Sequence, residues 1–351
     1  MADSSADDEA RAGQERARTN LEALLKTTDE IVNDIDWPTG RIAHTEQLRR
    51  DILVPLHNRL DSLDEQENDA LRNGKISIKH RLSDFKRTYG TLEESTAFVD
   101  TAFALIKEGL DHDPSNGKLR DEHAMNLSKR GKLFLFEGKP QEALTDFESA
   151  LSTFEEGVEM QPLATQYIEK GEALMALGRP DLAVESYDKG IFKWNELAGP
   201  PTADYERAML AEALVLRAKA TKNSAKAMTQ LDRAYPLAFV LAQAESHNLL
   251  YQSILARVLV ARGSLFRTEE RFDDARTAYE QARTLAETMR EGDENHKEYA
   301  LLMCEALWGL ENVRGAPPAQ VKAWQTQRCK IAKEFVDKDS LDLRFQPYWC
   351  L

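Results

Sequence analysis

The sequence predicts an all-α protein, and three features of the chain indicate this. Segments of helical length rich in Ala, Leu, Glu, Lys and Arg alternate with short turns that carry Gly, Pro, Asn and Asp. Long alternating runs of Val, Ile and Thr, which are typical of β-strands, are nearly absent. A pattern of small and aromatic residues also recurs along the chain. Together these features favour stacked helical repeats over a single packed bundle.

The predicted N-terminal helices precede this repeating pattern. Helices are expected near 15–34, 44–72 and 75–89, separated by turns at 37–40 (WPTG) and 73–74 (NG). Thr91 and Glu94 then have the spacing of a capping box, in which a threonine N-cap and a glutamate three residues later exchange hydrogen bonds. A helix is therefore expected from Thr91 to about Leu110, and it resembles the second helix of an incomplete repeat.

Three copies of the repeating pattern can be aligned without gaps. They occupy residues 137–151, 177–191 and 269–283. Each copy contains an alanine that follows a glycine by twelve residues and precedes an aromatic residue by four. The three sets are Gly131, Ala143 and Phe147 in the first copy, Gly171, Ala183 and Tyr187 in the second, and Gly263, Ala275 and Tyr279 in the third. A small residue lets two antiparallel helices approach closely while the aromatic ring fills the groove between them. The pattern thus predicts pairs of antiparallel helices.

This pattern resembles the tetratricopeptide repeat (TPR) family. The match covers the family's small residue at position 8, its alanine at position 20, its aromatic at position 24 and its small residue at position 27, which is Ala150, Gly190 or Ala282. A degenerate repeat fits between the second and third copies, with Val215, Ala227, Leu231 and Ala234 in the corresponding positions. The resemblance implies a right-handed superhelical solenoid of long helix pairs, similar to the TPR regions of bacterial signalling proteins.

The resemblance divides the chain into four predicted parts. They are an acidic disordered tail (1–14), an N-terminal helical region with an incomplete repeat (15–115), TPR-like repeats (116–292), and a C-terminal helical cap and tail (293–351). The cap is expected to contain helices at 295–313 and 318–336, without the glycine and aromatic signature of the family. The aromatic tail FQPYWCL is expected to pack back on the cap, with a recognition segment as the alternative.

A partner-binding groove is the functional feature that the resemblance implies, because the first helix of each repeat lines the concave face of such solenoids. The residues at groove positions that we expect to contact a partner are Lys132, Leu135, Phe136, Glu172, Met175, Arg257 and Arg267. Ser128, Ile168, Val260 and Ser264 occupy the same face. The Lys and Asn residues of the carboxylate clamp found in chaperone-binding members are missing, so capture of a C-terminal EEVD-type peptide is not expected.

Bulk composition excludes several other classes of protein. The 351 residues carry a net charge of −14, which disfavours nucleic-acid binding because that is driven by Lys and Arg. The acidic N-terminus lacks the features of a signal peptide, and no apolar run reaches the length of a membrane span, so a cytoplasmic protein is expected. The three cysteines, Cys304, Cys329 and Cys350, show no disulfide or metal spacing, which suits a reducing compartment.

The chain carries no recognisable catalytic motif and one stretch that resembles a metal-binding loop. The chain contains no phosphate-binding loop, dinucleotide fingerprint, nucleophile elbow or zinc motif, so no enzyme, cofactor or metal site is predicted. Asp111, Asp113, Ser115 and Glu122 have the spacing of a calcium-binding EF-hand loop. Asn116 stands where that loop needs glycine, so a capping turn at the entrance to the repeats is the preferred interpretation.

The expected function is a non-enzymatic protein–protein interaction module. It would serve as an adaptor or regulatory subunit that binds a protein or peptide segment in the concave TPR groove. The alternative is a sensor that closes on a small ligand or peptide and thereby changes its binding of a partner. Neither nucleic acid nor membrane is expected as a partner, and the oligomeric state stays open.

Overall fold

The computed structural model describes residues 19, 23–28, 30–31, 41–42, 44–63, 69–157, 160–200 and 202–350. The predicted tail at 1–14 and the predicted turn at 37–40 lie outside these residues. Within the predicted helix at 15–34, residues 23–28 are helical. No strand occurs in the described part of the chain, and the all-α prediction is confirmed.

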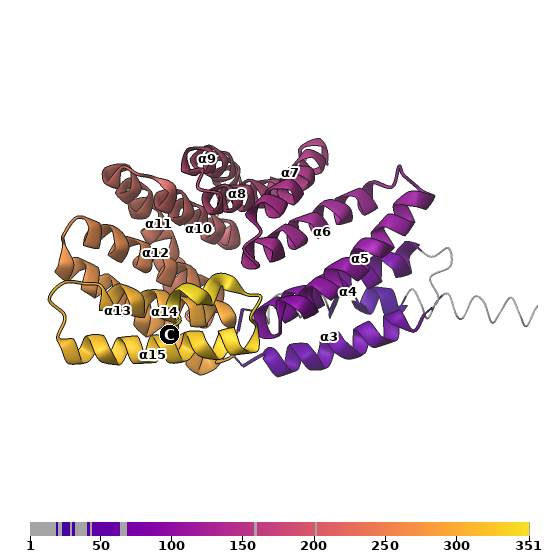
Figure 1. The fold of residues 1–351 in the computed structure, drawn as a ribbon. Helices are drawn as coiled ribbons and strands as arrows, with labels where there is room; N and C mark the ends of the chain where they lie inside the picture. The colour runs from indigo at the N-terminus through magenta and orange to yellow at the C-terminus, as the bar shows by residue number, and fades with distance from the viewer. Residues whose placement is uncertain are drawn as a thin grey trace, which may run out of the picture.

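Helices follow one another as antiparallel neighbours along the whole described chain (Figure 1). They are α3 (Glu46–Asp61), α4 (Asp69–Tyr89), α5 (Leu92–His112), α6 (Gly117–Phe136), α7 (Pro140–Gly157), α8 (Met160–Ala176), α9 (Pro180–Leu197), α10 (Asp204–Ala220), α11 (Ser224–Ala244), α12 (Leu249–Thr268), α13 (Phe272–Gly292), α14 (Lys297–Glu311), α15 (Pro318–Lys338) and the 3₁₀ helix η2 (Leu343–Tyr348). The capping box is present as predicted, since Thr91 Oγ1 accepts from Glu94 N and Glu94 Oε2 accepts from Thr91 N.

The small and aromatic residues of the repeats pack as the sequence predicts. A Cβ atom added to Gly131 would lie 2.5 Å from the ring of Phe147, and one added to Gly263 would lie 2.9 Å from the ring of Tyr279. Gly171 faces Tyr187 in the same way. All three aromatic residues are at most 1% exposed, so each ring fills the space that the missing side chain leaves between the two helices of a pair.

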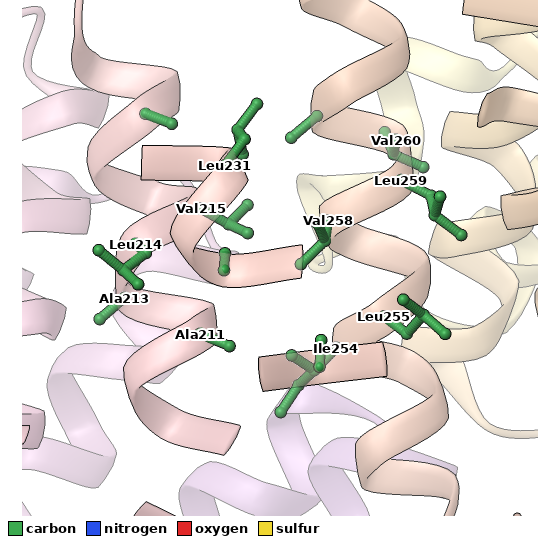
Figure 2. Close-up of a cluster of buried hydrophobic side chains, with 14 of the residues drawn as sticks. Ala211, Ala213, Leu214, Val215, Leu231, Ile254, Leu255, Val258, Leu259 and Val260 are labelled. Atoms are coloured by element: carbon green, nitrogen blue, oxygen red, sulfur yellow. The ribbon is translucent and has the colours of Figure 1, made fainter. Parts of the chain in front are cut away.

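The degenerate repeat is also a helix pair, formed by α10 and α11. Val215, Ala227, Leu231 and Ala234 are all buried, at 4% exposure or less. Figure 2 shows Val215 of this pair pointing toward Val258 of α12, in a cluster that also contains Leu214, Leu231 and Ile254. Aliphatic side chains therefore replace the glycine and aromatic contact at this point of the solenoid.

Helix α12 is the described helix that is long and apolar enough to cross a membrane, although the sequence analysis found no such run. Its Leu249–Thr268 segment has a mean hydropathy of 1.2 in an 18-residue window, and 67% of that window is buried inside the protein. The helix packs against α10, α11, α13 and α14. Its apolar character is accounted for by a position in the middle of the solenoid.

Two predictions about helix boundaries and signatures are wrong. Asn73 and Gly74 do not end a helix, because α4 runs through both residues. Gly74 is buried, and a Cβ atom there would lie 2.9 Å from Leu25, so close packing explains this glycine. The C-terminal pair does carry a glycine that packs against a repeat aromatic. Gly309 of α14 lies against the ring of Tyr279, which also contacts Gly263 of its own repeat. Tyr279 is therefore enclosed by two glycines.

The two ends of the solenoid meet, so that the helices form a closed ring (Figure 1). Tyr89 at the end of α4 donates a hydrogen bond to Asp293 (Oη–Oδ2 2.6 Å). Leu92 N at the start of α5 donates to Asp339 Oδ2 (2.9 Å), and the same oxygen accepts from Lys297 Nζ at 2.7 Å. We call this contact between α4–α5 and the C-terminal helices the seam.

The C-terminal tail packs back on α14 and α15, as preferred in the sequence analysis. Phe345 is fully buried and stacks on Phe335, with 4.8 Å between the ring centres. Cys350 forms a disulfide with Cys329 of α15, whose Cα atom lies 5.3 Å from its own. The expectation that the cysteines lack a disulfide is therefore wrong, because the fold brings together two residues that the sequence separates by 21 positions.

Candidate functional site

A large cavity lies inside the ring formed by the described helices. Its volume is about 850 Å³. The first helix of each pair contributes to its wall through α6, α8, α10, α12 and α14, while α3, α4 and η2 close it at the seam. The concave face of the solenoid is thus the wall of a cavity. The groove predicted from the sequence corresponds to the inner surface of this cavity.

The charge of the cavity wall is opposite in sign to that of the chain. Nine cationic and six acidic side chains line it: Arg41, Arg49, Arg81, Arg87, Lys129, Lys132, Lys219, Arg257 and Arg344; Asp84, Glu169, Glu172, Glu212, Glu298 and Glu305. The whole chain carries a net charge of −14. Charges that line a concave, poorly solvated site focus the local potential, so the cavity favours ligands that carry charged groups.

A chain of ion pairs runs around most of the wall from one first helix to the next. Lys132 of α6 donates to Glu169 of α8 (Nζ–Oε1 3.1 Å), and Ser128 Oγ donates to the other oxygen of Glu169 at 2.6 Å. Further round the ring, Glu212 of α10 pairs with Arg257 of α12. These bridges tie neighbouring repeats together on their inner side.

The same chain of ion pairs continues through the tail back to the first repeat. Arg257 Nη2 lies 3.0 Å from Glu298 Oε2 of α14, and Glu298 also pairs with Arg344 of η2. The guanidinium of Arg344 lies 3.7 Å from the centre of the Phe136 ring on α6. Burial opposes ionisation of Glu298, but Arg344, Arg257 and Arg87 outweigh it and hold the pKa of Glu298 below its usual range.

The chain of ion pairs is interrupted between α8 and α10. Glu169 and Glu172 of α8 are followed there by Glu212 of α10 without an ion pair that joins the two helices among the described residues, and Glu172 has neither a hydrogen bond nor an ion pair with any described residue. Burial raises the pKa of Glu172 to about 7; Lys132 opposes this, while Glu169 and Glu212 add to it. Glu172 is therefore a carboxyl group of the wall without a direct partner among the described residues, although Lys132 and Arg257 act on it electrostatically.

The part of the cavity wall beside the seam is cationic. Arg87 Nη2 is 3.8 Å from Asp84 Oδ1, whereas Lys129 Nζ already lies 2.7 Å from Asp84 Oδ2. The neighbouring His296 stacks on Tyr299, and its buried Nδ1 atom has no hydrogen-bond partner among the described residues. Burial lowers the pKa of His296 to about 3, so the imidazole is neutral and can donate or accept one hydrogen bond.

Four of the seven predicted groove residues line this cavity. They are Lys132, Phe136, Glu172 and Arg257, and Ile168 lies beside them. The other three lie elsewhere: Leu135 and Met175 are half-buried against the hydrophobic core, and the guanidinium of Arg267 lies 5.2 Å from the centre of the Trp308 ring. Val260 is 6% exposed in the core, and Ser264 hydrogen-bonds Tyr279.

Several cavity residues were missed by the sequence analysis for two different reasons. Glu212 stands three residues before Val215, so the groove position of the degenerate repeat would have predicted it. Arg87, Glu298 and Arg344 belong to segments outside the recognised repeats. No local pattern places those three at the cavity, because the closure of the ring brings them there.

The EF-hand-like stretch forms a helix-capping turn. Asn116 Oδ1 accepts from Leu119 N at 3.1 Å and caps α6, as predicted. Asp113 accepts hydrogen bonds from Ser115 N and Oγ within the turn. Asp111 pairs with Lys107, and Glu122 faces His80 of α4 at 3.5 Å. Asp111 therefore pairs within its own helix and Glu122 with a side chain of another helix, while Asp113 and Ser115 bond to each other within the turn.

Comparison with known proteins identifies the fold of the chain through solved structures. A scan against protein-family models gives no match, and a search of curated proteins gives none. Among solved structures, NprR in complex with its cognate peptide NprX superposes with a TM-score of 0.56 at 13% identity, over 95% of this chain and 82% of that one. The fold is that of a TPR-type solenoid.

Two further solved structures share this fold. The apo form of RapI gives a TM-score of 0.54 at 12% identity, over 93% of this chain and 79% of that one. A Rap protein complexed with Competence and Sporulation Factor gives 0.50 at 9% identity, over 94% and 96% of the two chains. The likeness extends along almost the whole chain.

Proposed function

We propose that this protein is a non-enzymatic regulatory module that binds a short peptide segment inside the ring. Occupancy of the cavity then changes how the outer surface of the solenoid holds a protein partner. The proposal joins the two functions considered from the sequence: a partner segment bound by the concave face, and a sensor that closes on its ligand. We propose the cytoplasm, within a bacterial signalling assembly, as its setting.

The observation that carries the proposal is the walled cavity with its broken chain of ion pairs. A volume of about 850 Å³ falls within the roughly 300–1,000 Å³ typical of ligand pockets. A folded domain cannot enter such a space, whereas a short extended segment can. Because the wall is shared by eight helices and the tail, a bound segment would contact both ends of the ring at once.

The charges of the wall indicate the chemistry of the segment. A cationic group of the ligand would pair with Glu172 and complete the chain of ion pairs between α8 and α10. A carboxylate would face Arg87 and the neutral imidazole of His296. A short peptide with a basic group and a free or side-chain carboxylate supplies both, and its apolar parts would contact Ile168, Phe136 and Trp194.

One of the solved structures with this fold supports a peptide as the ligand, and a second was solved with a bound factor. NprR was solved with its cognate peptide NprX, and a Rap protein with Competence and Sporulation Factor. Those ligands are reported for those proteins. Their relevance here is that a solenoid of this shape and extent can accept a small partner.

The test is a binding measurement with short synthetic peptides that have free termini and are grouped by net charge. Thermal shift identifies the binding group, and calorimetry then gives the affinity. We expect zwitterionic peptides with a basic side chain to bind. Glu172→Gln should weaken their binding by roughly tenfold to a hundredfold, since a hydrogen bond to a charged group is worth about 1.5–3 kcal/mol.

The matched control is Glu280→Gln, which changes the same functional group on the exposed face of α13 and should leave binding unchanged. Phe136→Ala provides a second cavity variant that keeps every charge. Equal binding by wild type, Glu172→Gln and Phe136→Ala would place the ligand outside the cavity and contradict the proposal. The proposal would also be contradicted if no group of peptides bound to the protein.

A further inference from the structure

The C-terminal tail forms part of the cavity wall as well as part of the cap. We call residues Leu341–Cys350 the strap. Its η2 helix reaches from α15 across α14 to the first repeat, where Leu343 lies against Gly138. Two strap side chains, Arg344 and Tyr348, line the cavity. The strap is therefore the element that joins the end of the solenoid to its first repeat on the inner side.

The two halves of the strap are held in different ways. The first half is anchored by Phe345, which is fully buried, and by Arg344, which pairs with Asp342 at 2.6 Å and with Glu298. The second half contains Gln346, Pro347 and Trp349, which are all exposed. Tyr348 between them is half-buried, with its ring against the α14–α15 cluster.

Only two described links hold the second half to the rest of the protein through polar or covalent bonds. Arg328 donates to the carbonyl oxygen of Tyr348, and Cys350 is bonded to Cys329. A single hydrogen bond contributes less, net of its competition with water, than the conformational entropy lost when several residues become ordered. The disulfide therefore adds the one covalent restraint on residues 346–350 to this hydrogen bond and to the packing of the Tyr348 ring.

The disulfide is accessible to reductants, whereas the remaining thiol is not reactive. Cys329 and Cys350 are both half-buried at the surface. Accessible disulfides are typically the labile or regulatory ones. Cys304 is fully buried, and burial raises the pKa of its thiol to about 12. Because a thiolate is the attacking species, Cys304 cannot exchange with the pair at neutral pH.

We propose that the Cys329–Cys350 disulfide is a redox switch that controls access to the cavity through the strap. In the oxidised protein the bond holds Tyr348 in the wall, where it lies beside Glu305. In the reduced protein the residues after Phe345 leave the wall, and the cavity opens on that side. This switch goes beyond the proposed function, because it operates without any bound ligand.

The chemistry requires a dithiol reductant. One of its thiolates attacks a sulfur of the Cys329–Cys350 bond, forming a mixed disulfide and releasing the other cysteine as a thiolate. The second thiol of the reductant then displaces the protein sulfur. The protein gains two electrons and two protons as two thiols, and the reductant leaves as its own disulfide.

The experiment compares the full chain before and after reduction with dithiothreitol. Hydrogen exchange should become about tenfold or more faster at Trp349, whose amide donates to Gln346 O at 3.2 Å, with α14 unchanged. Carbodiimide labelling of Glu305, which lines the cavity with Tyr348, should rise severalfold when followed by mass spectrometry, because the loss of Tyr348 from the wall opens the cavity on that side. Cys350→Ser should reproduce the reduced state without reductant.

The matched control is Cys304→Ala, which keeps the disulfide and should retain the full redox response. Equal exchange at Trp349 in the oxidised and reduced proteins would overturn the proposal. An unchanged labelling of Glu305 would overturn the claim of access even if the tail itself loosens. Failure of Cys350→Ser to resemble the reduced wild type would also contradict it. None of these readouts requires the peptide ligand, so they stand apart from the proposed function.

Discussion

The repeat interfaces and the seam hold the same ring together by different physical means. Between the helices of a repeat, the contacts are an aromatic ring set against a glycine, as with Tyr279 and Gly263. At the seam, the contacts are polar: Tyr89 with Asp293, and Leu92 N and Lys297 with Asp339. The side chains of Lys297 and Asp339 are only 3% and 2% exposed.

The two kinds of contact have different effects: the apolar contacts stack the helices, and the polar contacts decide how the ring closes. Apolar contacts between neighbouring helices are non-directional and stabilise any stacking that removes them from water. Buried polar contacts require one arrangement of donors and acceptors, and an unmatched group there is costly. The repeats therefore supply stability, while the seam selects one curvature of the solenoid and with it one shape of cavity.

The largest expected effect comes from the repeat side of this comparison. Tyr279→Ala should lower the free energy of unfolding by about 3–5 kcal/mol, because the ring is 1% exposed and lies between Gly263 and Gly309. Urea denaturation measures the change. Tyr279→Phe, which loses only the hydroxyl contact to Ser264, serves as the control and should cost about 1 kcal/mol. A cost for Tyr279→Ala close to that of the control would contradict the predicted repeat packing.

The next effect tests the seam. Asp339→Ala should cost about 3 kcal/mol, at the lower end for a broken buried ion pair, since Lys297 keeps Asp342 at 3.6 Å. Faster hydrogen exchange at the Leu92 amide should show that the loss lies at the seam. Lys333→Ala, which breaks the exposed Lys333–Asp337 pair, provides the comparison and should cost about 0.5 kcal/mol or less. Equal costs for the two variants would mean that the seam is not a structural joint.

A third effect concerns the cavity, where the polar contacts are incomplete. The folded state raises the pKa of Glu172 from 4.5 to about 7, so between these values the folded protein binds more protons than the unfolded chain. Stability should therefore fall as pH rises from about 4.5 to 7, by roughly 2–3 kcal/mol from this group. Glu172→Gln should remove that part of the pH dependence in denaturation curves measured across this range. Parallel curves for the two proteins would show that Glu172 ionises normally in the fold.

The smallest effect is a stabilising one in the repeats. Gly138 and Gly178 adopt positive φ angles of 71° and 69° after α6 and α8, and Glu270 takes the same conformation (φ 59°) in the third copy. Glycine meets little steric cost there, whereas a residue with a Cβ atom does. Glu270→Gly should therefore raise the free energy of unfolding by about 0.5–1 kcal/mol, measured as a higher denaturation midpoint. A loss of stability would mean that the carboxylate has a role the turn conformation does not reveal.

How far the sequence predicts each region depends on the range of the interactions that form it. Capping by Thr91 and Asn116, and the pairing of Gly131 with Phe147, involve residues close in the chain or at a regular spacing, and they were predictable. Asn73-Gly74 was misleading because a glycine permits a turn but also permits close packing inside a helix, and only the neighbouring Leu25 decides between them. In the cavity, Lys132 and Glu172 followed from repeat positions, whereas Arg87 and Arg344 did not.

The sequence by itself determined the helices, their pairing and the small-to-aromatic contacts within the repeats, because periodicity records which face of each helix is buried. Only the tertiary structure decided that the solenoid closes on itself. Closure depends on the curvature summed over helix pairs of unequal length, and no single repeat encodes that sum. The walled cavity follows from this closure, since its lining joins residues of α4 and α6 to residues of α14 and η2.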